Sequence, residues 1–282
     1  MALPNSGKMT MTMITTEFKA PAASKLSDFY RGGQYVRQNN IKIPTSGPIK
    51  FSDFYGATSM LVIVHDVRQD SLFLDINFIL AIYQWDGITP VDLTINIAPG
   101  VVIYSNNTAR PALHITPIIA ESVVRINNSG YIIGMGGAGR DATNQQKAED
   151  GGISILIEES SIINNTGTIC GGGGGGASAR RGNFAAGGGG GQTGKENSKG
   201  GLGLYGDQRQ DGKPGTFSDG GDGGNAQGYN GRGGKGGNWG QNGGNAYIEG
   251  GTIGKAGLGG KALVGNNKVT WINQGTIAGS IV

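Results

Sequence analysis

Glycine is concentrated in the second half of this 282-residue chain, and this concentration limits what that half can fold into. Of the 56 glycines, seven lie before residue 130, which leaves 49 in residues 130–282. Each interior glycine destabilises a helix by roughly 1 kcal/mol relative to alanine, and glycine loses the most backbone entropy on folding. An ordinary core of helices and sheets is therefore excluded for residues 130–282.

Glycine tracts of this density have two physical interpretations. They can be flexible coil, or they can be extended left-handed threads of about three residues per turn whose backbone groups bond neighbouring threads. A flexible linker has no use for aromatic side chains, yet five lie between the tracts: Phe184, Tyr205, Phe217, Tyr229 and Trp239. The sequence therefore favours an ordered sandwich of the polyglycine II type over residues 130–282.

Residues 59–129 are predicted to form a β-domain, and the chain as a whole is expected to be all-β. Residues 91–97 alternate strictly between apolar and polar, which is typical of a half-buried strand. Further short apolar segments follow at a spacing of about ten residues, which indicates a sandwich or a solenoid. An Asn-x-Gly repeat at residues 126–134, 163–171 and 272–279 predicts stacked rungs or corners of one β-layer, with isoleucines pointing inward.

A different repeat marks residues 1–58, which are predicted to be an attachment arm with residues 1–24 extended. The segment KLSDFYRG at residues 25–32 returns as KFSDFYG at residues 50–56. Ser and Asp suit the start of a short helical turn, and Gly suits its end. The aromatic pairs are either packed corners of a small domain or anchors that insert into a partner. The candidate docking residues are Phe29, Tyr30, Phe54 and Tyr55.

Several functional classes are not expected. A net charge of +3 creates no field that would indicate nucleic-acid binding. The single cysteine, Cys170, excludes an internal disulfide and is predicted to be packed rather than catalytic, and His65 and His114 have no cysteine nearby that would indicate a metal site. Residues 134–139 match the dinucleotide pattern G-x-G-x-x-G, but no crossover helix follows. We expect no enzyme, cofactor or metal.

The loops between the glycine tracts are the candidate recognition elements, because loops on a rigid scaffold commonly carry binding residues. They are residues 178–184, 192–217 and 228–239, which combine cations with aromatics that suit sugar faces or acidic groups; simple solvated turns are the alternative. The candidate binding residues are Arg180, Arg181, Phe184, Tyr205, Arg209, Phe217, Tyr229 and Trp239.

Two parts of the sequence resemble known protein families. The repeat in residues 25–58 resembles a motif of tailed-phage virion proteins, and the segments RINNSGYIIGMGGAG and NNTGTICGGGGGG resemble the glycine-rich receptor-recognition proteins of phage tails and tail fibres. The resemblance implies a virion tail adhesin whose distal loops bind a bacterial surface protein or polysaccharide. Fibre-tip adhesins attach through their own N-terminal region, which the SDFY repeat replaces here.

Partners and location follow from that resemblance. Residues 1–58 would attach to other virion proteins, and a homotrimer remains open. The first 25 residues contain no apolar signal-peptide core, so the protein is expected to be made in the host cytoplasm before assembly into the tail. One alternative is a purely structural virion protein, such as a tail-tip, collar or decoration piece. A remote alternative is an ice-binding protein, although the glycine tracts contain few threonines.

Overall fold

The computed structural model describes residues 3–143, 147–203, 210–226 and 230–282. Within these ranges strands predominate and helices are few, which confirms the expected all-β class. The chain divides into two compact units. The first contains Met1–Ile63, Ile82–Leu93 and Ile118–Val123, and the second contains Val64–Ala81, Thr94–Pro117 and Val124–Val282. The domain boundaries after residues 58 and 129 stay predictions.

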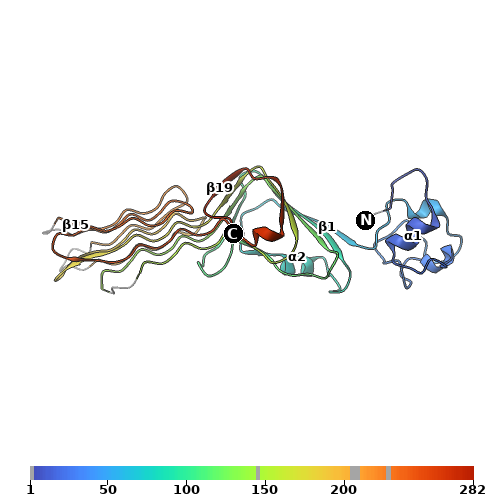
Figure 1. Ribbon diagram of the computed structural model, residues 1–282, viewed down its shortest axis with the longest axis horizontal. Helices are drawn as coiled ribbons and strands as arrows, with labels where there is room; N and C mark the ends of the chain where they lie inside the picture. The colour runs from blue at the N-terminus through green and yellow to red at the C-terminus, as the bar shows by residue number, and fades with distance from the viewer. Residues whose placement is uncertain (1–2, 144–146, 204–209, 227–229) are drawn as a thin grey trace. The chain divides into compact units, whose positions relative to one another are not determined.

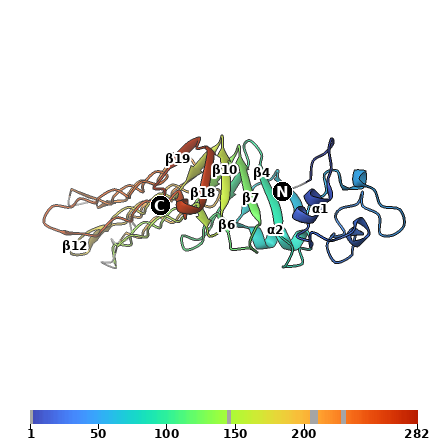
Figure 2. The same cartoon turned by 45° about the vertical axis from the view of Figure 1, so that its right-hand side comes forward.

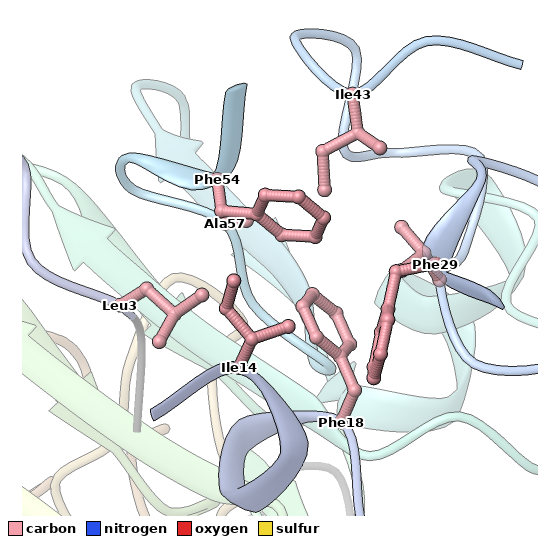
Figure 3. Packing of buried hydrophobic residues seen from close by; sticks show 8 residues of the cluster. Leu3, Ile14, Phe18, Phe29, Ile43, Phe54 and Ala57 are labelled. Carbon is pink, nitrogen blue, oxygen red and sulfur yellow. The ribbon is translucent and has the colours of Figure 1, made fainter. Parts of the chain in front are cut away.

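The first unit has an aromatic core (Figure 3). Its helical elements are α1 (Met11–Glu17), η1 (Leu26–Phe29) and η2 (Phe51–Phe54). Phe29 and Phe54 come from the two SDFY copies, are fully buried, and have ring centroids 6.2 Å apart. Phe18, which directly follows α1, packs on both rings, at 6.0 Å from Phe29 and 6.3 Å from Phe54. The two copies therefore form the two sides of one core.

Residues 1–24 are not the extended arm that the sequence predicted. Thr10 caps α1 by accepting a hydrogen bond from the Met13 N–H. Ile14 of this helix is fully buried beside Phe18 in the aromatic core. The extended prediction was wrong because the helix is stabilised by burial against Phe29 and Phe54, residues distant in the sequence, and not by its own propensity.

The SDFY turns form as short 3-10 helices, and their aspartates close them. Asp28 accepts a hydrogen bond from the Lys25 N–H at 2.8 Å, and Asp53 accepts one from the Lys50 N–H at the same distance. The serine lies inside each turn, so aspartate rather than serine satisfies the first free N–H. The same four-residue pattern therefore produces the same turn twice.

The chain from residue 61 onward contains a parallel β-solenoid, in which successive turns of the chain add a strand to each of three sheets. The first sheet has the order β1 (Leu61–Val67), β4 (Val91–Ile97), β7 (Val123–Asn128), β10 (Ser161–Asn165) and β18 (Val269–Asn273). The second has β2 (Ser71–Leu72), β5 (Val102–Tyr104), β8 (Tyr131–Ile133), β11 (Thr168–Cys170) and β19 (Thr276–Ala278). The third has β3 (Leu74–Asp75), β6 (Leu113–Ile115), β9 (Ile155–Ile157) and β17 (Leu263–Val264). Helix α2 (Ile76–Ile82) follows β3, and η3 (Asn266–Lys268) precedes β18.

The Asn-x-Gly repeats stack as rungs of this solenoid, as predicted. Ile163 lies in register with Ile126 in parallel strands, and the Asn128 amide donates to the Asn165 amide oxygen at 2.7 Å. Strands β7, β10 and β18 lie side by side in Figure 2. The third copy departs from the prediction, because Ile163 pairs with Trp271 and Asn164 pairs with Asn273, which leaves Ile272 of β18 out of the pairing. Ile272, which was expected to point inward, is instead 68% exposed.

The glycine tracts leave the solenoid between β8 and β9 and again between β11 and β17. Short hairpins interrupt them: β12 (Ala179–Arg181) with β13 (Phe184–Ala186), β14 (Asn225–Ala226) with β15 (Gly231–Arg232), and β16 (Thr252–Ile253) beside β12. The tracts themselves have neither helical nor strand hydrogen bonding. In Figure 1 they run side by side between the solenoid and the β15 end.

Backbone hydrogen bonds join these tracts with a period of three residues. In residues 170–177, N–H groups three positions apart bond the same neighbouring tract. The donor–acceptor pairs are Gly172 to Gly152 and Gly175 to Glu149, Gly173 to Gln192 and Gly176 to Gly189, and Gly174 to Gln241 and Ala177 to Gly244. Carbonyl groups of the same segment accept hydrogen bonds from three further tracts with the same three-residue period. The donors are the N–H groups of Gly134, Gly137 and Arg140 in the first tract, Gly257 and Gly260 in the second, and Gly234, Gly237 and Gly240 in the third. Residues 170–177 are thus surrounded by six neighbours.

This packing excludes side chains. A Cβ atom placed on Gly172 would lie 1.9 Å from the Met135 carbonyl oxygen, and one on Gly175 would lie 1.9 Å from that of Ala138. Real Cβ atoms do not approach a backbone oxygen so closely. The backbones approach one another this closely only because glycine has no side chain.

Cys170, at the end of β11, is fully buried, and burial raises the pKa of its thiol to about 12 from an ordinary value of 9.0. We expect no reaction with a thiol reagent in the folded protein at about pH 8 and rapid reaction after unfolding in guanidinium, because the thiolate is the reactive form. Burial favours the neutral thiol, so its contribution to stability is complete below pH 9.0 and is lost as the pH rises towards about 12. Labelling of folded protein as fast as a free thiol would contradict this assignment.

Candidate functional site

The glycine tracts have two ends with different surroundings. We call the end that carries β12 to β16 the far end, and the end at which the tracts join β8, β11 and β17 the near end (Figure 1). Several chain reversals at the far end are hairpins. The surface of this end is therefore made of loops on a closely packed backbone scaffold.

One far-end hairpin holds three of the predicted binding residues together. Arg181 pairs with Phe184 across β12 and β13, and Gly182 between them has φ 57°, which permits the tight turn. The Arg181 Nη1 donates to the Glu249 carbonyl at 2.9 Å, and the Arg180 Nε donates to the Gly182 carbonyl at 3.1 Å. Arg180, Arg181 and Phe184 are half-buried, so parts of all three side chains remain available to a ligand.

Phe217 and Trp239 lie at the near end and do not join this hairpin. Their ring centroids are 5.2 Å apart, and Phe217 also packs edge-on against Tyr131 of β8 at 5.6 Å. The Trp239 indole donates to the Thr193 carbonyl at 3.2 Å. These aromatics connect the glycine tracts to the solenoid. Three other predicted residues, Tyr205, Arg209 and Tyr229, lie outside the residues that the structure describes.

The predicted loop at residues 192–217 is not one loop. Its first residues turn at the near end, where Lys195 forms an ion pair with Asp70 at 2.9 Å. The chain then re-enters the tracts, where the Gly201 N–H bonds the Gly188 carbonyl and the Gly212 N–H bonds the Gly201 carbonyl. The prediction was wrong here because polar residues separate these glycines in the sequence, although the glycines still pack in the interior.

The non-glycine residues of the tracts form a second exposed surface. Exposed side chains occur at every third residue: Asp219, Asp222 and Asn225; Arg232, Lys235 and Asn238; Lys255, Leu258 and Lys261. Lys235 pairs with Asp219 at 2.7 Å, and this contact lowers the pKa of the Asp219 carboxyl and raises that of Lys235. The sequence signal for this surface is the three-residue spacing of the non-glycine residues in the tracts. Threonine, which an ice-binding face would be expected to repeat, is absent from these positions.

The candidate docking residues of the first unit take part in its own packing. Phe29 and Phe54 are fully buried, so neither ring is free to insert into a partner, and the anchor interpretation of these two is corrected. Tyr30 and Tyr55 are half-buried, and their hydroxyls donate to the Gly47 and Gly7 carbonyls. Burial of the phenylalanines follows from the helix α1 packing, which the sequence pattern did not predict.

A groove of about 250 Å³ borders the second SDFY copy in the first unit. Asp53 and Tyr55 line one part of it, and Ile41 and Val62 line another. Ile41 is 77% exposed and Val62 is 56% exposed. This groove therefore presents apolar surface that the unit itself does not cover.

The described residues contain no group of His, Cys, Asp and Glu side chains that could hold a metal ion. His114 lies between Asp75 and Glu158, with its Nδ1 3.3 Å and its Nε2 2.7 Å from their carboxylate oxygens, and it thereby bridges neighbouring rungs. Burial lowers the pKa of His65, against the opposing charge of Asp66. No helix in the described part of the chain is long and apolar enough to cross a membrane.

Comparison with known proteins places the chain in a family. Residues 62–282 match the family model of the phage tail fibre adhesin Gp38. The fold is similar to a chain in the crystal structure of the gp37-gp38 adhesin tip complex of the bacteriophage S16 long tail fiber, with a TM-score of 0.61 and 27% sequence identity over 99% of this chain and 100% of that chain. A search of curated protein sequences found no significant match. Because the family model matches most of its length, this chain belongs to the phage tail fibre adhesin Gp38 family.

Proposed function

We propose that this protein is the receptor-binding tip of a phage tail fibre and that its far end contacts a protein or polysaccharide of the bacterial surface. The observation that carries the proposal is the far-end hairpin with Arg180, Arg181 and Phe184, which stands on a backbone scaffold too closely packed to admit side chains. A rigid support lowers the entropy that loops lose when they bind. The hairpin offers cations and an aromatic ring, which suit acidic groups and sugar faces.

We propose further that the glycine tracts are a polyglycine II sandwich. Three residues per turn explain why N–H groups three positions apart bond the same neighbour, and six neighbours around residues 170–177 are what hexagonal packing of such threads requires. The tract glycines also lie outside the left-handed region of φ, apart from those at turns such as Gly182, Gly240 and Gly250. This arrangement satisfies the backbone groups without forming a sheet.

The first unit is the proposed attachment region. The similar S16 structure is a complex of gp38 with gp37, and in this chain the groove beside the second SDFY copy offers apolar surface from Ile41 and Val62. Tyr30 and Tyr55 remain candidates at the edge of that unit, since both are partly exposed. A tail fibre protein is therefore the proposed partner, through residues 1–58.

Reversal of charge on the far-end hairpin is expected to weaken cell binding. The double variant Arg180→Glu, Arg181→Glu should bind susceptible cells at least about tenfold more weakly, because 1.4 kcal/mol of lost interaction corresponds to a factor of ten. Binding of labelled protein to cells, and its competition with phage adsorption, measure the effect.

The matched control makes the same charge change outside the hairpins, with Lys199→Glu and Lys261→Glu, which are both exposed. This control should bind as the wild type does. Equal loss in both double variants would show that total charge, and not the hairpin, governs adhesion. If wild-type protein fails to bind susceptible cells at micromolar concentration, a purely structural role in the tail explains the protein better.

A further inference from the structure

Arg140 is a buried cation for which the described residues supply no partner. The residue is 7% exposed and lies where its glycine tract reaches the far end. Its Nε and Nη2 atoms are both buried, and neither has a hydrogen-bond partner. Burial of an unpaired charge is strongly unfavourable, and buried polar groups in native structures are nearly always hydrogen-bonded. Within the described part of the chain, the site therefore lacks an acceptor.

The two unsatisfied atoms form one edge of the guanidinium group. Nε–H and Nη2–H are parallel donors, and together they match the two oxygens of a carboxylate or phosphate. Nη1 is not among the buried atoms without partners.

The surroundings hold the side chain in place, but the described residues give its Nε and Nη2 no hydrogen-bond acceptor. A Cβ atom on Gly254 would lie 3.5 Å from the Arg140 Cγ and 3.1 Å from the Ser178 Oγ, so the arginine stem and the serine flank this glycine. The nearest acidic residue along the chain, Asp141, accepts a hydrogen bond from the Leu202 N–H at 2.5 Å. Burial lowers the pKa of Arg140 and the Asp141 charge opposes this, yet an arginine stays charged in proteins.

We propose that Arg140 is the anchor of an oxyanion-binding site at the far end, which takes a carboxylate or phosphate group of the bacterial surface. The inference rests on the proposed receptor-binding role of this end and names the ligand chemistry. The bound oxyanion would accept both parallel hydrogen bonds and neutralise the buried charge. Ser178, whose hydroxyl flanks the same glycine, is placed to add a third hydrogen bond.

Thermal unfolding with small anions tests the site independently of cells. Wild-type protein is titrated with inorganic phosphate in one arm and with glucuronate in the other, against chloride at equal ionic strength. We expect the Tm of the transition in which the second unit unfolds to rise by about 5 °C when one of these anions exceeds its dissociation constant a hundredfold. The arm that responds at the lower concentration distinguishes a phosphorylated ligand from an acidic sugar.

The variant Arg140→Met gives the sharper readout. It should raise Tm in chloride, since a buried unpaired charge is replaced by an apolar side chain of similar length, and it should lose the anion-dependent increase. Arg140→Lys should keep only a small part of that increase, because an ammonium group cannot bind bidentately. The control is Lys261→Met, which removes an exposed cation outside the hairpins and should retain the wild-type response.

Two results would overturn the proposal. One is an unchanged Tm of the wild type with both anions, and the other is an equal anion response in Arg140→Met. Neither result decides whether the protein binds cells, since cell binding is measured separately with the hairpin variants.

Discussion

Gly175→Ala is expected to lower the free energy of unfolding of the second unit by more than about 4 kcal/mol, a size reached only by exceptional single substitutions. The added Cβ would lie 1.9 Å from the Ala138 carbonyl oxygen and 2.5 Å from its carbonyl carbon. Backbone atoms on the neighbouring tract cannot rotate away as a side chain can. The tract must therefore separate from its neighbours, which breaks hydrogen bonds such as that from the Gly175 N–H to the Glu149 carbonyl.

Guanidinium denaturation and soluble yield measure this effect, and Gly254→Ala is the control. At Gly254 the nearest atoms to an added Cβ are the side-chain atoms Ser178 Oγ at 3.1 Å and Arg140 Cγ at 3.5 Å, and φ is not in the left-handed region. This variant should change stability by less than about 1 kcal/mol. If Gly175→Ala folds with wild-type stability, the tracts are not packed as the structure shows.

Phe54→Ala should destabilise the first unit by about 3–5 kcal/mol, the usual cost of removing a buried phenylalanine. Phe54 is fully buried, and it packs edge-on against Phe29 and Phe18. Because the chain has two compact units, a single melting temperature does not report on one of them. Hydrogen exchange of residues 3–63, followed by mass spectrometry, should show faster exchange in the first unit and unchanged exchange in the glycine tracts.

The control for this substitution is Tyr55→Phe. It removes only the hydroxyl that donates to the Gly7 carbonyl and should cost about 1 kcal/mol. The comparison separates two roles for Phe54 of the SDFY motif, which are packing in the core of the first unit and docking to a partner. Wild-type exchange in Phe54→Ala, combined with lost attachment to the tail fibre, would mean that this phenylalanine acts as a docking anchor after all.

The rung repeats show which parts of the fold were predictable. Ile126 and Ile163 stack because an Asn-x-Gly corner of fixed length brings each following strand into the same register. Local composition and spacing contain that information. The last copy failed at Ile272, because the extra residue lies in β18, where the pairing passes from Trp271 to Asn273, and a shift of one residue moves a side chain to the other face.

The candidate site was predictable only in part. Arg180, Arg181 and Phe184 share a hairpin that chain proximity alone brings together. Phe217 and Trp239 were grouped with them because all are aromatic or basic residues between glycines, yet they pack with Tyr131 at the other end of the tracts. Composition does not show at which end a given reversal lies.

The sequence by itself determined that glycine dominates residues 130–282 and that such a segment must satisfy its backbone groups through neighbouring tracts, because it has few side chains to bury. It also determined the stacked rungs of the solenoid, because the same Asn-x-Gly corner recurs along the chain. Only the tertiary structure decided which tracts become neighbours, since backbone hydrogen bonds between glycines are chemically alike and carry no information about the partner. The positions of Arg140 and Trp239 depend on those neighbours, and that of Phe54 depends on its packing with Phe18 and Phe29, so their roles emerge only from the folded chain.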